Sequence, residues 1–135
     1  MTTKAIYFYS LTGKTEAALD KVVDVRKVKL NKIDPNEFRF NDENVIVIGT
    51  PTYGRGAPPE YFLGILKQLR LLRGRKIGLF GSGNTVYGDD FCGALDVLEE
   101  MLKEKNEIIF KIKFEGYPSS EVQKCLSEQV KGEYR

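Results

Sequence analysis

Short apolar runs alternate along this chain with longer segments in which apolar residues recur every three or four positions. Three runs are almost uninterrupted: Ala5–Tyr9, Val45–Ile48 and Ile77–Phe80. Such runs are typical of strands buried on both faces, as in a parallel sheet covered by helices. Charges interrupt a weaker run around Val25, Val28 and Leu30, and apolar and polar residues alternate from Ile108 to Phe114. These two segments are predicted to be strands nearer the edges of the sheet.

Helical spacing of apolar residues predicts the elements between the strands. The predicted helices are Glu16–Val22, Glu60–Leu69, Phe91–Glu104 and Glu121–Val130. In the second, one face is expected to hold Phe62, Leu63, Leu66 and Leu69. The third is expected to bury Leu95, Leu98 and Leu102. Thr12 is a candidate N-cap for the first helix, and Asp89 or Asp90 for the third.

The order of these elements predicts the fold class. Parallel strands need right-handed helical crossovers, so alternating strands and helices favour a three-layer α/β sandwich. Five strands in 135 residues fit a doubly wound parallel sheet with strand order 2-1-3-4-5. Residues 1–135 are expected to form a single domain.

Such a sheet binds ligands beyond the carboxyl ends of its strands, where the strand order reverses. That rule selects three connections: Ser10–Thr15, Thr50–Pro59 and Gly81–Asp90. In the first, Ser10, Thr12 and Thr15 offer hydroxyls beside Gly13, and a phosphate group would fit there. The alternative is that this loop is only a helix cap. A nucleotide-triphosphate P-loop is excluded, because the position that needs its first glycine is Phe8.

The other two connections each contain an aromatic residue. Tyr53 is followed by Gly54, which lets a planar ring approach the backbone closely. Tyr87 lies in a long loop rich in glycine, and long loops in compact domains are often functional. The alternative for the connection with Tyr53 is a plain connecting turn, and the alternative for the connection with Tyr87 is an ordinary helix start. A phosphate pocket and two aromatic side chains around one crevice indicate a site for flavin mononucleotide (FMN).

The composition excludes several other kinds of catalytic and metal site. The chain has no histidine, which excludes Ser-His-Asp triads and histidine zinc sites. No metal site is predicted. Cys92 and Cys125 form no CxxC motif and fit structural thiols in a reducing cytoplasm. A redox-active cysteine pair is the alternative. The net charge of +2 gives no reason to expect nucleic acid or a membrane as a partner, and no apolar run approaches the length of a membrane span.

Three motifs in order resemble the flavodoxin superfamily over nearly the whole chain. They are Tyr7–Thr15, Thr50–Gly54 and the stretch from Gly81 through Tyr87 to Ala94. The chain is most similar to NrdI, the flavodoxin-like protein of class Ib ribonucleotide reductase systems. That similarity is carried by Ser10-Leu11-Thr12-Gly13, the short first helix, the loop with Pro58, and Ser82-Gly83-Asn84 followed by Gly88-Asp89. That resemblance implies an FMN redox protein that helps to activate the dimanganese cofactor of the reductase. The Phe91–Asp96 and Glu115–Pro118 sequences resemble general short-chain flavodoxin electron carriers instead.

The resemblance implies which residues hold FMN. The expected set is Ser10, Leu11, Thr12, Gly13, Lys14, Thr15, Thr50, Pro51, Thr52, Tyr53, Gly54, Arg55, Ser82, Gly83, Asn84, Tyr87, Asp90 and Phe91. In this assignment Ser10 to Thr15 bind the phosphate, and Tyr53 and Tyr87 flank the flavin ring. Lys14 departs from the family, which usually has asparagine there. The lysine adds a positive charge but removes a side chain that normally organises the loop.

The resemblance also implies partners. A redox protein is expected to accept or supply electrons: the small subunit of a class Ib ribonucleotide reductase, a flavodoxin reductase or a thioredoxin-like reductant. Two alternatives stay open at this point. One is a general electron carrier, and the other is a module of the same fold that binds no flavin.

Overall fold

Five parallel strands form one sheet in the order β2-β1-β3-β4-β5. The computed structural model describes residues 3–10, 12–52, 59–83 and 92–132. The strands are β1 (Lys4–Phe8), β2 (Arg26–Lys29), β3 (Val45–Pro51), β4 (Lys76–Gly83) and β5 (Glu107–Glu115). The helices are α1 (Lys14–Ala17), α2 (Glu60–Gly64), α3 (Leu66–Leu71), α4 (Gly93–Leu102) and α5 (Ser120–Lys131), with a 3₁₀ turn η1 (Leu30–Lys32). The predicted fold class and strand order are confirmed.

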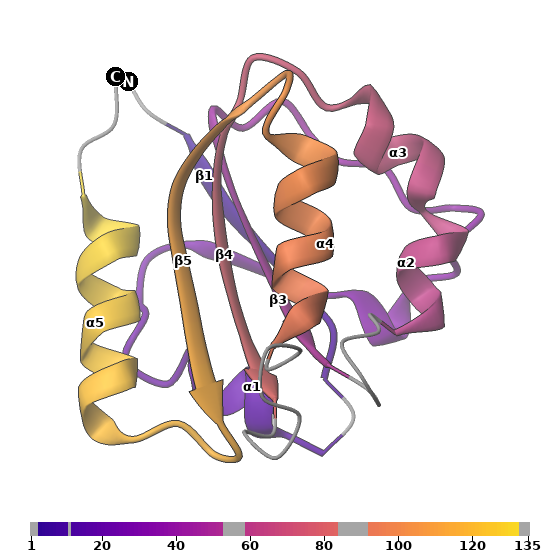
Figure 1. Cartoon of the computed structure of the whole chain (residues 1–135). Helices are drawn as coiled ribbons and strands as arrows, with labels where there is room; N and C mark the ends of the chain where they lie inside the picture. The colour runs from indigo at the N-terminus through magenta and orange to yellow at the C-terminus, as the bar shows by residue number, and fades with distance from the viewer. Residues whose placement is uncertain (1–2, 11, 53–58, 84–91, 133–135) are drawn as a thin grey trace.

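Helices cover both faces of the sheet (Figure 1). One apolar cluster lies under α2, α3 and α4 and includes Phe62, Leu69, Leu95 and Leu98. A second cluster lies under α5 and the turns after α1, and includes Leu19 and Leu126. The three central strands are buried from both sides, which is why their sequences are continuously apolar.

Two glycines make room for phenylalanine rings in the second apolar cluster. Gly49 of β3 is the register partner of Phe80 of β4, and Gly78 of β4 is the partner of Phe110 of β5. A Cβ atom at Gly49 would lie 2.2 Å from Cζ of Phe80. A Cβ atom at Gly78 would lie 2.2 Å from Cζ of Phe110. Each glycine therefore makes room for the ring of the neighbouring strand.

The predicted helix over 60–69 is interrupted in the structure. It divides into α2 and α3 at Ile65, whose φ of −111° and ψ of 18° are not helical. Glycine is a poor helix former, and Gly64 packs so closely on Pro35 that a Cβ atom would lie 2.7 Å from the proline Cβ. Phe62 and Ile65 face the core, whereas Leu63 is 67% exposed. The expectation that Leu63 shares the buried face is therefore wrong.

Two other segments differ from the predicted pattern. The first helix has only one turn, Lys14–Ala17, rather than the predicted Glu16–Val22, and turns follow it as far as Lys21. Between β4 and β5 the register shifts: Ile77 of β4 pairs with Ile108, but Gly78 pairs with Phe110, so Ile109 is an extra residue that forms a bulge in β5. As a result Ile108 packs with one core and Phe110 with the other.

Candidate functional site

The first loop follows β1 at the carboxyl edge of the sheet and enters α1. Its buried members are Ser10 and Thr15, which are 5% and 1% exposed. Gly13 has a φ of +86°, a conformation that favours glycine. Gly13 is also the N-cap of α1, and no side chain caps that helix in the usual way. The alternative interpretation of Thr12 as the cap is therefore wrong. Instead the Ser10 hydroxyl accepts a hydrogen bond from the Glu16 backbone N–H at 3.4 Å.

The hydroxyl of Thr15 has no hydrogen-bond partner among the described residues, although it is buried. A buried polar group without a partner is unfavourable by about 1–3 kcal/mol and calls for an explanation. A phosphate oxygen at this loop would supply an acceptor. The orphaned hydroxyl and the left-handed glycine therefore fit a bound phosphate group.

Two side chains outside the loop hold it in place, and neither was predicted from the sequence. The Asn31 amide accepts a hydrogen bond from the Ser10 N–H and donates one to the Ser10 carbonyl, both at 2.9 Å. The Tyr117 hydroxyl donates to the Thr12 carbonyl oxygen at 2.9 Å. Asn31 follows β2 and Tyr117 follows β5. The one sequence signal that could have identified Asn31 and Tyr117 is that each follows a strand, since all parallel strands end at the same edge of the sheet.

The second connection begins at the end of β3. Thr50 is fully buried, and its hydroxyl donates to the Pro51 carbonyl at 2.8 Å. The Thr52 N–H donates to the Ser82 carbonyl at 3.0 Å, and the Thr52 hydroxyl accepts from the Ala94 N–H at 3.3 Å. Thr52 therefore joins the ends of β3 and β4 to the beginning of α4. The predicted site residues Tyr53, Gly54 and Arg55 lie outside the described residues.

The third connection leaves β4 at Ser82 and Gly83 and re-enters the described chain at Cys92. Ser82 is 4% exposed and is the register partner of Pro51. The N-cap of α4 is Cys92, at a φ of 52°. The prediction that Asp89 or Asp90 caps this helix is therefore wrong. The predicted site residues Leu11, Asn84, Tyr87, Asp90 and Phe91 lie outside the described residues. The roles of those residues stay predictions.

An aromatic group also lies beside the first loop and was not predicted. The rings of Tyr9 and Tyr61 have their centroids 5.6 Å apart. The Tyr61 hydroxyl is buried and has no partner in the described part of the chain. Burial, with a smaller contribution from the Asp34 charge, raises the pKa of Tyr61. This phenol therefore stays neutral at physiological pH.

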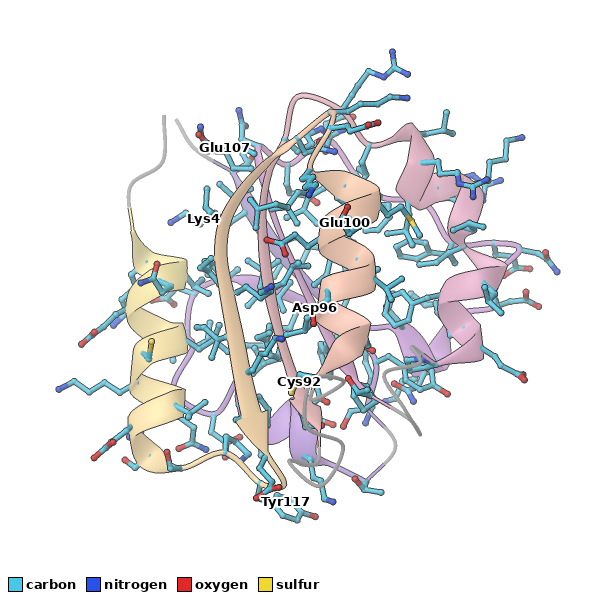
Figure 2. All side chains as sticks on the ribbon, viewed as in Figure 1. Lys4, Cys92, Asp96, Glu100, Glu107 and Tyr117 are labelled. Atoms are coloured by element: carbon cyan, nitrogen blue, oxygen red, sulfur yellow. The ribbon has the colours of Figure 1, made fainter. Side chains whose placement is uncertain are left out.

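Cys92 packs as a structural thiol at the beginning of α4 (Figure 2). Its Sγ lies 3.5 Å from the Gly81 carbonyl oxygen and 3.6 Å from that of Phe114. Burial raises the pKa of Cys92 to about 11. Cys125 is exposed, and both cysteines are free thiols. The expectation of structural thiols is met by Cys92, and the two cysteines form no disulfide in this structure.

The two thiols are expected to differ sharply in reactivity. In the native protein at pH 8 a disulfide reagent should modify Cys125 quickly and Cys92 only after unfolding, because the reactive species is an accessible thiolate. Because burial raises the pKa of Cys92 from about 9 to about 11, the thiol of the unfolded chain ionises first as the pH rises. The contribution of Cys92 to folding stability is therefore complete below about pH 9 and is lost as the pH rises through about 11. Timed thiol titration measures the difference. Cys125→Ser is the control and should leave no fast-reacting thiol. Equal rates at both cysteines would contradict the assignment.

The structure thus brings the described parts of all three predicted loops to one edge of the sheet. The Ser10–Thr15 loop follows the central β1, and the register pairs Thr50 with Gly81 and Pro51 with Ser82 on the neighbouring strands. Within the described ranges no three acidic, cysteine or histidine residues are grouped as a metal site. No helix among these residues is long and apolar enough to cross a membrane.

An open parallel sheet with this strand order and a hydroxyl-rich loop at its switch point defines the flavodoxin-like class of α/β proteins. Comparison with protein families agrees, because the flavodoxin family model matches residues 6–127. The chain therefore belongs to the flavodoxin family. The resemblance expected from the three motifs is confirmed at this level.

Individual relatives are also flavodoxins. Probable flavodoxin 2 of Bacillus subtilis (strain 168) is 30% identical over 132 residues, covering 90% of this chain and 87% of that protein. The structure of oxidised flavodoxin 2 from Bacillus cereus has a TM-score of 0.78 at 26% identity and covers 96% of this chain and 95% of its own. A variant of Fusobacterium nucleatum flavodoxin bound to FMN has a TM-score of 0.65 at 26% identity, covering 83% of this chain and 68% of its own. These similarities support the general flavodoxin alternative better than the NrdI-like one.

Proposed function

We propose that this protein is an electron carrier of the short-chain flavodoxin type that holds one FMN at the carboxyl edge of its sheet. The observation that carries the proposal is the buried Thr15 hydroxyl, which has no partner among the described residues and lies in the loop proposed to bind the flavin phosphate. Bound FMN would supply one-electron redox chemistry, which no side chain of the described site offers.

The described residues would have separate tasks in such a carrier. The phosphate would be bound by Ser10, Thr12, Gly13, Lys14 and Thr15. The side of the site next to the flavin ring, called here the floor, would be formed by Thr50, Pro51, Thr52, Ser82 and Gly83. The hydrogen bonds of Thr52 to Ser82 and Ala94 keep the ends of β3 and β4 close to α4. A floor built from strand ends is rigid, so the ring would be oriented before a partner arrives.

The proposed partners are redox proteins that deliver electrons to the flavin and take them from it. A flavodoxin reductase or a thioredoxin-like reductant is the proposed donor. A cytoplasmic location suits the reduced free thiols, Cys92 and Cys125. The specific role in activating a dimanganese ribonucleotide reductase is a narrower form of the same redox chemistry. No feature of the described site favours it over general electron transfer.

The absorption spectrum of the purified protein mixed with FMN tests the proposal. A bound flavin shifts the visible bands and loses its fluorescence. The loaded protein should then pass electrons from a flavodoxin reductase to a one-electron acceptor such as cytochrome c. A protein that stays colourless after incubation with FMN and dialysis would contradict both redox functions. Activation of a dimanganese reductase subunit without relay to cytochrome c would favour the NrdI-like role.

A further inference from the structure

An open hollow lies between α3 and the chain that leads from η1 to β3. Its volume is about 150 Å³, and an apolar space of this size accommodates a group as large as a benzene ring. The residues that line it are Arg39, Phe40, Gln68, Leu71, Leu72 and Arg75. Leu72 is buried and Phe40 is half-buried, whereas Leu71 is 61% exposed. The hollow, called here the α3 hollow, therefore combines an apolar lining with two arginines.

Hydrogen bonds and ring packing hold the two walls of the α3 hollow together. The ring of Phe40 packs edge-on against that of Phe38, with 4.7 Å between the ring centres. The Gln68 amide donates from α3 to the Phe38 carbonyl at 3.3 Å. Arg75 donates to two backbone carbonyls within 41–43, both at 2.9 Å. The hollow is thus formed before a ligand arrives, which lowers the entropy that binding would cost.

The rim of the α3 hollow carries positive charge that this chain neutralises poorly. Lys67 and Arg39 are exposed, and neither forms an ion pair with any residue that the structure describes. The hydrogen bonds of Arg39 go to backbone carbonyls. Arg75 Nη2 lies 3.9 Å from Oδ1 of Asp42, whose side chain is fully exposed, and such surface pairs contribute little. The rim therefore attracts an anionic partner.

The combination of apolar lining and cationic rim fits an acidic segment of a protein best. A buried apolar anchor and arginine contacts contribute most to binding at protein interfaces. A lipid surface would require a broader apolar face, and Leu71 is the one large apolar side chain of α3 that is exposed. Nucleic acid is disfavoured, because the chain as a whole has a net charge of only +2.

The α3 hollow lies far from the proposed flavin site. Figure 1 shows α3 near the end of the sheet where β4 begins, whereas α1 lies at the opposite end. Arg75 directly precedes β4, and Ser82 and Gly83 end it eight residues later. At a rise of about 3.3 Å per residue, the two ends of β4 are roughly 25 Å apart. A segment bound in the hollow would leave the carboxyl edge of the sheet open.

We propose that the α3 hollow is a docking site for an acidic segment of a partner protein. An apolar side chain of that segment enters the hollow, and carboxylates on either side of it pair with Arg39, Lys67 and Arg75. Docking at this end tethers the partner and raises its local concentration beside the protein without covering the flavin edge. No residue of the proposed flavin site takes part, so this inference stands or falls separately from FMN binding.

A fluorescein-labelled peptide tests the docking site with the full chain, both flavin-free and after incubation with FMN. The peptide has a single phenylalanine flanked on each side by three glutamates, and its dissociation constant is measured by fluorescence anisotropy. Saturable binding that weakens as salt is added is expected in both preparations. An alanine in place of the phenylalanine should weaken binding about tenfold or more. Lysines in place of the glutamates should abolish it.

Substitutions on the rim show whether the peptide binds where proposed. Arg39→Gln combined with Lys67→Met should weaken peptide binding about tenfold, and Leu71→Ser about fivefold. The matched controls are Lys124→Met, which removes an exposed cation of α5, and Val23→Ser, which removes an exposed apolar side chain outside α3. Neither control should change peptide affinity. All of these variants should keep the melting temperature and the FMN affinity of the unmodified protein.

Amide chemical shifts in NMR spectra locate the bound peptide. The largest changes are expected within 38–43 and 67–75. The proposal is overturned by a peptide that does not bind, by changes confined to the carboxyl edge, or by unchanged affinity in the double variant. Displacement of the peptide by an equal concentration of duplex DNA would instead assign the hollow to nucleic acid.

Two further measurements separate the remaining occupants. Binding to vesicles of phosphatidylcholine and phosphatidylserine that Leu71→Ser abolishes would overturn the proposal in favour of a membrane. A dimer in analytical ultracentrifugation that the double variant dissociates would overturn it in favour of a second copy of this chain. A protein that binds the peptide through the hollow but never binds FMN would support the docking site and contradict only the proposed electron-carrier function.

Discussion

Replacing Thr15 with valine is expected to weaken FMN binding about tenfold or more and to stabilise the flavin-free protein. The two effects have opposite signs because the Thr15 hydroxyl is buried and has no hydrogen-bond partner in the part of the flavin-free protein that the structure describes. Valine has nearly the same shape and removes the unpaired group, which should raise the free energy of unfolding by about 1 kcal/mol. The same change removes a hydrogen-bond donor from the proposed phosphate site.

Urea unfolding of the flavin-free protein and fluorescence titration with FMN measure the two effects separately. Thr50→Val is the matched control. Thr50 is also a buried threonine beside the site, but its hydroxyl is hydrogen-bonded to the Pro51 carbonyl. Its removal should therefore lower the stability. A Thr15→Val protein with lower stability and unchanged FMN affinity would show that the hydroxyl has a structural partner and no role in binding.

Gly49→Ala is expected to lower the free energy of unfolding by about 3 kcal/mol, the upper part of the range for overpacked cores. The new methyl group would overlap the Phe80 ring, whose nearest atom lies 2.2 Å from the added Cβ position. Neither group has space to retreat, because both residues belong to central strands covered by helices. Denaturant unfolding of a protein of this size gives the difference directly.

The same clash predicts a specific rescue. All three of the nearest atoms to the added Cβ belong to Phe80, so in a Phe80→Leu background Gly49→Ala should be unfavourable by less than about 1 kcal/mol. Gly78→Ala is the matched control. Its clash is with Phe110, so Phe80→Leu should not rescue it. Equal destabilisation by Gly49→Ala in both backgrounds would mean that the ring does not fill the space above Gly49.

The sequence by itself determined the sheet. Continuous apolar runs mark strands that are covered on both faces, and this local pattern is visible without knowledge of the fold. The alternation of runs and helical segments then led to a parallel order, and the switch-point rule selected the connecting loops in advance. Ser10, Thr15, Thr50 and Ser82 were found in this way, and the structure places all four at one edge, buried.

Only the tertiary structure decided which distant side chains complete that edge. Asn31 binds Ser10, and Tyr117 binds Thr12 across 105 positions of the chain. No local pattern encodes such contacts, because they depend on where other strands end. The interruption at Ile65 and the bulge in β5 were hidden for a related reason. Helical and strand periodicity describe ideal elements, whereas the close approach of Gly64 to Pro35 and the register of β4 with β5 are set by packing between elements.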